Sequence, residues 1–127
     1  MKIKITEVIK SFEDAAKATG RPSTSDFSNI PEDLREHFEA HYQIIVIAEA
    51  LNEGWKPNWD DDNEAKYYPW FWKEEEGVSS GFVFYGTDYR YSRASAGYGL
   101  RLCFKTRALA EYAGEQFIEI WNKILLK

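Results

Sequence analysis

The feature that most constrains the fold is a helical repeat of apolar residues in the middle of the chain. These residues recur at steps of three and four positions: Leu34, Phe38, Tyr42, Ile45, Ala48 and Leu51. That spacing places them on one face of a helix of about five turns. Pro31 suits the first turn of such a helix, and Gly54 suits its end. The sequence therefore predicts a long amphipathic helix that buries one face against the rest of the protein.

Two further helices are predicted on either side of this one. Residues 11–14, SFED, resemble a capping box, and Gly20 ends the helical segment that follows them. Near the C-terminus, Thr106 is placed to cap a helix with its own apolar stripe. The stripe consists of Leu109, Tyr112, Ala113, Phe117, Ile120, Trp121 and Ile124.

Between the last two of these helices the pattern changes to alternation, which is typical of strands. Residues 66–75, 82–91 and 98–104 form three such segments, separated by turn sequences. Pro69 cannot donate a backbone hydrogen bond, so we expect the first strand to lie at a sheet edge or to carry a bulge. The predicted fold is α+β: a three-stranded antiparallel β-meander packed with about three α-helices, in the order ααβββα, as a single domain over residues 1–127.

The composition limits the classes of protein to which this chain can belong. The chain has 127 residues, of which 44 % are hydrophobic, enough to bury one core without covalent cross-links. Cys103 is the single cysteine, which excludes an intramolecular disulfide. No apolar run approaches the roughly 18 residues of a membrane span, and the first residues lack the apolar stretch of a signal peptide. We therefore expect a soluble cytoplasmic protein without membrane contact, and the net charge of −5 argues against nucleic acid as an obligate partner.

The aromatic segment KYYPWFWKE, residues 66–74, raises the question of which way its rings point. Alternation predicts one sheet face of Phe and Leu and an opposite face that mixes Tyr and Trp with Arg. The candidate binding residues on that second face are Trp70, Trp72, Tyr85, Tyr89, Tyr91, Arg90 and Arg101. Such a mixture is typical of protein interfaces and also of surfaces that stack the bases of single-stranded nucleic acid. A third interpretation is that a helix covers this face, which would make the rings part of the core.

Few residues suggest catalysis. His37 and His41 lie at positions i and i+4 of the long helix, a spacing that can present two imidazoles to one metal ion. The surrounding HFEAH lacks the glutamate of either zinc-protease motif, so these two are weak metal candidates only. Cys103 lies in mid-strand among apolar residues, as a buried filler would. The sequence thus nominates no catalytic residue and no cofactor, and a metal-dependent enzyme remains a third alternative.

The acidic segment DDDNE, residues 60–64, alternates like the start of a calcium-binding loop. It has no glycine at the sixth position, and its twelfth position is Phe71, where such loops place a bidentate glutamate. The match therefore fails at the two positions that the calcium geometry most requires.

Three segments together resemble a known group of proteins: SFEDAAKATG, IAEALNEGWKPNWDDDNEAKYYPWF and GLRLCFKTRALAEYAG. They are similar to a family of small uncharacterised proteins encoded by phages, prophages and other mobile elements of gut anaerobic bacteria. The resemblance covers most of the chain and implies a setting inside a bacterial host cell, with no activity, cofactor or site attached. We therefore expect a non-enzymatic accessory protein that binds another protein or a second copy of itself. The alternative is a single-stranded nucleic-acid binder that uses the Tyr/Arg face.

Overall fold

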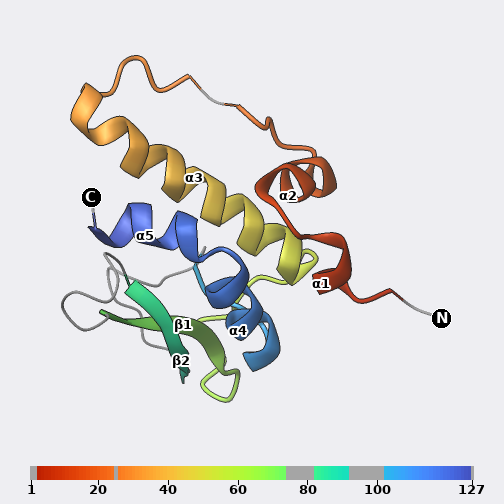
Figure 1. Cartoon of the computed structure of the whole chain (residues 1–127). Coiled ribbons are helices and arrows are strands. Elements are labelled where there is room, and N and C mark those ends of the chain that lie inside the picture. The colour runs from red at the N-terminus through yellow and green to blue at the C-terminus, as the bar shows by residue number, and fades with distance from the viewer. Residues whose placement is uncertain (1–2, 25, 74–81, 92–101, 127) are drawn as a thin grey trace.

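The computed structural model of the chain describes residues 3–24, 26–73, 82–91 and 102–126. Within these ranges the chain forms five helices and one antiparallel β-hairpin. In chain order they are α1 (Ile5–Val8), α2 (Phe12–Thr19), α3 (Glu32–Asn52), β1 (Lys66–Lys73), β2 (Phe82–Arg90), α4 (Arg107–Gln116) and α5 (Ile118–Leu126). Figure 1 shows the long α3 crossing the molecule, with α2 on one side of it and α4, α5 and the hairpin on the other. The α+β class is confirmed, with five helices where about three were predicted.

The ends of α2 and α3 follow from local sequence. The Ser11 hydroxyl accepts a hydrogen bond from the Asp14 N–H at 3.1 Å, and α2 ends at Gly20, which has a left-handed φ of 74°. Helix α3 begins directly after Pro31 and ends where Glu53 and Gly54 both adopt left-handed conformations, with φ of 49° and 87°. Both helices therefore begin and end close to the predicted residues.

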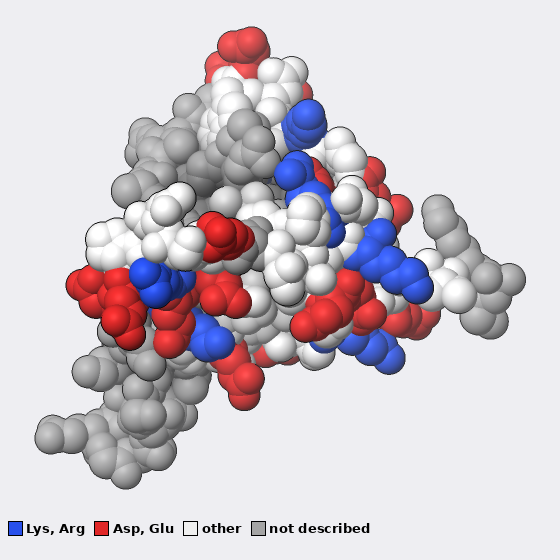
Figure 2. Space-filling model, turned by 90° about the horizontal axis from the view of Figure 1, so that it is seen from above, with Lys and Arg blue, Asp and Glu red and all other residues white. Residues whose placement is uncertain are grey.

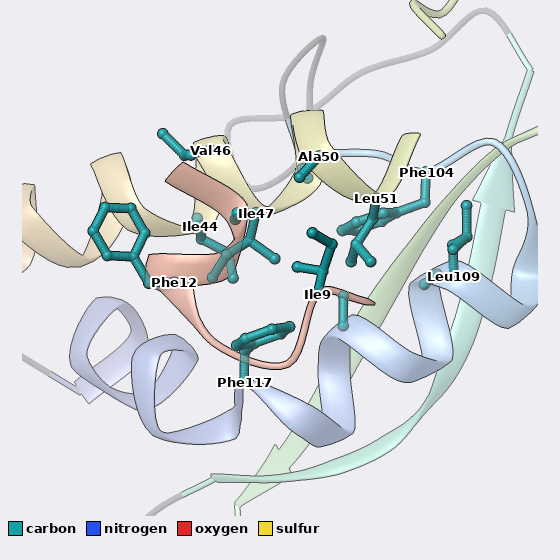
Figure 3. Packing of buried hydrophobic residues seen from close by; sticks show 14 of the residues in the cluster. Ile9, Phe12, Ile44, Val46, Ile47, Ala50, Leu51, Phe104, Leu109 and Phe117 are labelled. Carbon is teal, nitrogen blue, oxygen red and sulfur yellow. The ribbon is translucent and has the colours of Figure 1, made fainter. Parts of the chain in front are cut away.

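The core is built around α3, which packs against α2 and against α4 and α5, and it is completed by the segment that joins α1 to α2. Figure 3 shows side chains from these elements pointing toward one another. The large side chains of the core are Ile9, Phe12, Ile44, Ile47, Leu51, Phe104, Leu109, Phe117 and Trp121, each at most 7 % exposed. Their burial supplies the main favourable term in folding, at about 25 cal/mol per Å² of apolar surface removed from water.

The buried face of α3 differs from the predicted stripe. Leu34 and Phe38 are 43 % and 45 % exposed, whereas Ile44 and Ile47 are fully buried. The reason is that the N-terminal half of α3 extends past the body of the protein, so the helix is covered only along its C-terminal half (Figure 1). No helix in the described ranges is long and apolar enough to span a membrane.

The predicted C-terminal helix is divided at Phe117, where φ is −111° and ψ is 30°. This change of direction lets α4 pack against the hairpin while α5 also packs against α3. At the break, the Trp121 indole N–H donates to the Ala113 carbonyl at 3.0 Å. The Tyr112 hydroxyl donates to the Ile9 carbonyl, so α4 also anchors the segment between α1 and α2.

The two strands form an antiparallel ladder from Lys66↔Arg90 to Lys73↔Phe82. The register shifts after Trp70↔Gly86, because the next pair is Phe71↔Phe84 and Tyr85 is left over as a bulge. The prediction that the Pro69 strand lies at an edge or carries an irregularity is therefore confirmed for the described sheet.

The predicted third strand, residues 98–104, lies partly outside the described residues. Its described end makes a single bridge, in which Tyr67 and Phe104 exchange both backbone hydrogen bonds at 3.0 and 2.7 Å. The next hydrogen-bonding position along this edge of β1 is Pro69, which has no N–H to donate. The described sheet accordingly has two strands where three were predicted, and Pro69 gives a physical reason for the interrupted pairing.

Candidate functional site

The hairpin has one face turned toward α4 and α5. Pro69 and Phe84 lie against Gly114 of α4, and the Phe71 ring lies 5.3 Å from the Trp121 ring of α5, centroid to centroid. Parity within the strand predicts that Phe71 packs with Phe82, Phe84 and the C-terminal helix. This is confirmed for Phe84, with a Phe71–Phe84 centroid distance of 6.4 Å, and for the helix, whereas the Phe82 side chain lies outside the described part of the structure. This face is part of the packed interior, so it does not supply a binding surface.

The opposite, outer face carries a pair of aromatic rings. Trp70 alternates with Pro69 and Phe71 and therefore points away from the helices. Its ring contacts that of Tyr85, with centroids 4.4 Å apart and an angle of 44° between the planes. The Trp70 indole nitrogen lies 3.6 Å from the place that a Cβ atom would occupy on Gly86, so the indole also covers its glycine neighbour on β2. Tyr85 remains 61 % exposed, the highest exposure of any described aromatic side chain.

Tyr89 and Tyr91, which were predicted to belong to the same patch, lie elsewhere. Tyr89 pairs with Tyr67 across the ladder, at a centroid distance of 5.7 Å, and Tyr67 has the parity of Pro69 and therefore shares the helix-facing side. Tyr91 packs on Tyr89 at 5.5 Å. The predicted single patch is thus wrong: the bulge at Tyr85 reverses the parity of the residues on either side of it.

The structure says less about the remaining predicted binding residues, Trp72, Arg90 and Arg101. Trp72 pairs with Val83, and Arg90 pairs with Lys66, but the structure describes only the backbone of Trp72 and Arg90. Arg101 lies outside the described residues. The Tyr/Arg surface is therefore not assembled from the predicted arginines. The one described arginine that lies over a tyrosine ring of the sheet is Arg107, whose guanidinium carbon is 5.5 Å from the centre of the Tyr67 ring.

The outer face also carries a carboxylate. Asp88 pairs with Tyr68 across the ladder, and the Tyr68 hydroxyl donates a hydrogen bond to Asp88 Oδ2 at 3.3 Å. The Tyr89 backbone N–H donates to the other carboxylate oxygen at 2.7 Å. A carboxylate held beside Trp70 and Tyr85 makes this face less suited to phosphate groups than to peptide chains.

The acidic segment at residues 60–64, which does not match a calcium-binding loop, folds around Lys66. The sequence analysis did not predict this role for Lys66. Lys66 is fully buried, and its ammonium group donates to the Asp61 carbonyl at 3.1 Å. The same nitrogen lies 3.6 Å from a Glu64 carboxylate oxygen and 5.2 Å from the centre of the Trp59 ring. A buried ammonium needs such partners. The loop over residues 58–65 is therefore an internal cap on Lys66, and the only sequence signal for it is the run of acids directly before a lysine.

The two histidines do come together. The rings of His37 and His41 are stacked, with centroids 5.7 Å apart and planes within 16°, and His37 Nδ1 is buried without a hydrogen bond to any described residue. Burial and then the neighbouring His37 lower the pKa of His41. Among the described residues, no cluster of three His, Cys, Asp or Glu side chains could hold a metal ion. The pair alone is therefore an incomplete metal site within the described chain.

Cys103 is fully buried, as its sequence context predicted. Burial raises the pKa of its thiol to about 11, which keeps it protonated near neutral pH. The Asn52 side-chain amide holds this segment in place by donating to the Cys103 carbonyl at 3.0 Å and accepting from the Lys105 N–H at 3.1 Å. The position is that of a structural thiol.

No protein-family model, no curated protein and no solved structure matches this chain. The resemblance to proteins of phages and mobile elements therefore remains a prediction from the sequence.

Proposed function

We propose that this protein is a non-enzymatic binding module that docks a partner protein through the outer face of its β-hairpin. The observation that carries the proposal is the Trp70–Tyr85 ring pair, in which Tyr85 is 61 % exposed on the sheet face opposite α4 and α5. Tyrosine and tryptophan are the side chains that most often contribute binding energy at protein interfaces. The setting, an accessory protein of a phage or other mobile element, rests on the sequence resemblance alone.

A protein partner is favoured over single-stranded nucleic acid by the charges that accompany these rings. Asp88 places a carboxylate on the same face, held by Tyr68, and the chain carries a net charge of −5. On the α2 and α3 side of the protein, which faces away from the hairpin, Figure 2 shows basic and acidic side chains interspersed, with no continuous basic track among the coloured residues of that side. Nucleic-acid affinity depends mainly on such a track.

The test compares Tyr85→Ala with Tyr91→Ala, a matched control that removes another exposed tyrosine from a different side of the sheet. Proteins captured from the producing cell would be identified, purified and titrated against both variants and the wild type. We expect Tyr85→Ala to weaken binding at least about tenfold and Tyr91→Ala to change it less than about threefold. Sedimentation of the same variants checks whether the partner is a second copy.

Two results would contradict the proposal. One is equal partner affinity for Tyr85→Ala and the wild type. The other is salt-sensitive binding of a short single-stranded oligonucleotide at tens of micromolar that Tyr85→Ala abolishes, which would establish the alternative function.

A further inference from the structure

A hollow of about 770 Å³ lies at the C-terminal end of α3. Figure 1 shows α1 and α2 beside this end of α3. Its apolar walls come from all three helices and from the segment that follows α3: Ile5, Ala18, Ile45, Ala48, Trp55 and Pro57. Hollows of roughly 300–1,000 Å³ with apolar walls and a few polar groups are typical small-molecule sites.

The electrostatics of this hollow are set by the end of α3. The last turn of α3 contains no basic residue, although cations are the charges that stabilise a helix C-terminus. It contains Glu49, whose carboxylate is paired with Arg21 through two hydrogen bonds of 2.6 and 2.8 Å. Glu53, directly after the helix, also lines the hollow, and its carboxylate makes no hydrogen bond or ion pair with any described residue.

Glu53 is unfavourable in two ways that glycine would avoid. It has a left-handed φ of 49°, and no other described non-glycine residue has a positive φ. Glycine adopts this conformation at a helix C-terminus without the steric cost that a side chain incurs. Glu53 also adds a negative charge at the negative end of the α3 dipole. A ligand that brings a positive charge to this position would offset the electrostatic term.

The other charged groups around the hollow do not reverse the preference for a positively charged ligand. Arg21 and Lys56 contribute two positive charges, and Glu49 and Glu53 contribute two negative charges. The C-terminal ends of α2 and α3 both open on the hollow, through Thr19 and Asn52, and add partial negative charge from their carbonyl groups. The balance therefore favours a cation.

We propose that this hollow binds a small organic cation, with its ammonium group beside Glu53 and the end of α3. The apolar body of the ligand lies against Ile45, Ala48 and the Trp55 ring. This activity is separate from partner docking at Tyr85, because the two sites share no residue.

The test uses three probes of similar shape and different charge: phenethylammonium, 2-phenylethanol and 3-phenylpropionate. Isothermal titration and the melting temperature report binding to the wild type, Glu53→Gly, Glu53→Gln and Glu111→Gln, an exposed acid on α4 that serves as the control. We expect phenethylammonium to bind the wild type and Glu111→Gln at least about fivefold more tightly than either other probe, and to lose that advantage in both Glu53 variants.

The Glu53→Gly variant distinguishes a role of Glu53 in ligand binding from a role of Glu53 in the stability of the fold. Without ligand it should melt a few degrees higher than the wild type, since glycine suits the left-handed position. It should nevertheless bind phenethylammonium less tightly, and a variant that gains stability cannot lose binding through unfolding. Equal affinities of the wild type for the three probes, or an unchanged affinity of Glu53→Gly for phenethylammonium, would overturn the proposal.

Discussion

Replacing Gly114 by alanine is expected to destabilise the protein, although alanine is the better helix former. A Cβ atom at position 114 would lie 2.7 Å from Phe84 Cε1 and 2.9 Å from Pro69 Cβ. Since real Cβ contacts are longer than 3.0 Å, α4 and the hairpin would have to move apart. Overpacking of this kind costs about 1–3 kcal/mol, and the gain in helix propensity is about 1 kcal/mol. We therefore expect a net loss of up to about 2 kcal/mol in the free energy of unfolding.

Urea denaturation followed by tryptophan fluorescence and circular dichroism measures this loss. The midpoint should fall with little change in slope, and the melting temperature should fall by roughly 4 °C for each kcal/mol. Adding Phe84→Leu, which shortens the side chain that the new methyl group meets, should make Gly114→Ala less costly than in the wild type. A Gly114→Ala variant more stable than the wild type would refute the close approach of α4 to the hairpin.

Two further predictions follow from the packing and from the stacked histidines. Phe71→Ala should lower the free energy of unfolding by about 2–4 kcal/mol in urea denaturation, because the Phe71 ring packs on Trp121. A loss no larger than that of Tyr85→Ala would contradict the assignment of sheet faces. Stability should fall as the pH drops below about 6.5, because the lowered pKa of His41 means that the unfolded chain binds its proton more tightly. His41→Gln should flatten this part of the stability–pH curve, and an unchanged curve would exclude a role for the pair.

Local signals in the sequence predicted most of the secondary structure. The cap at Ser11, the Pro31 and Gly54 boundaries, and the alternation within the aromatic segments each act within a few residues, so they could be read without the fold. The class of the fold and the two described strands followed from them. The faces of β1 were also assigned correctly at Phe71, because parity within one uninterrupted strand is reliable.

Other features depend on contacts between distant residues and could not be predicted. The bulge at Tyr85 moves Tyr89 to the other side of the sheet. The one local signal for it is Gly86, because an isolated glycine in a strand favours a bulge without specifying which residue is left unpaired. The limitation of the described pairing to a single bridge at Phe104 depends on which edge of β1 the Pro69 nitrogen faces. Glu53 resembles any exposed helix-end residue until its φ and the hollow beside it are known. The burial of Lys66 likewise requires knowing that the preceding loop folds back over it.

The packing of α4 and α5 against α3 has a consequence for synthesis on the ribosome. Fifty-five positions separate Asn52, the end of α3, from Arg107, the start of α4. At about 5–20 residues per second, the nascent chain carries Ile47 and Leu51 without their α4 partners for roughly 3–11 s. During this interval α2 can already dock on α3, but the Ile9 carbonyl has yet to meet the Tyr112 hydroxyl. The core on this side of α3 therefore closes only after α4 and α5 have been synthesised.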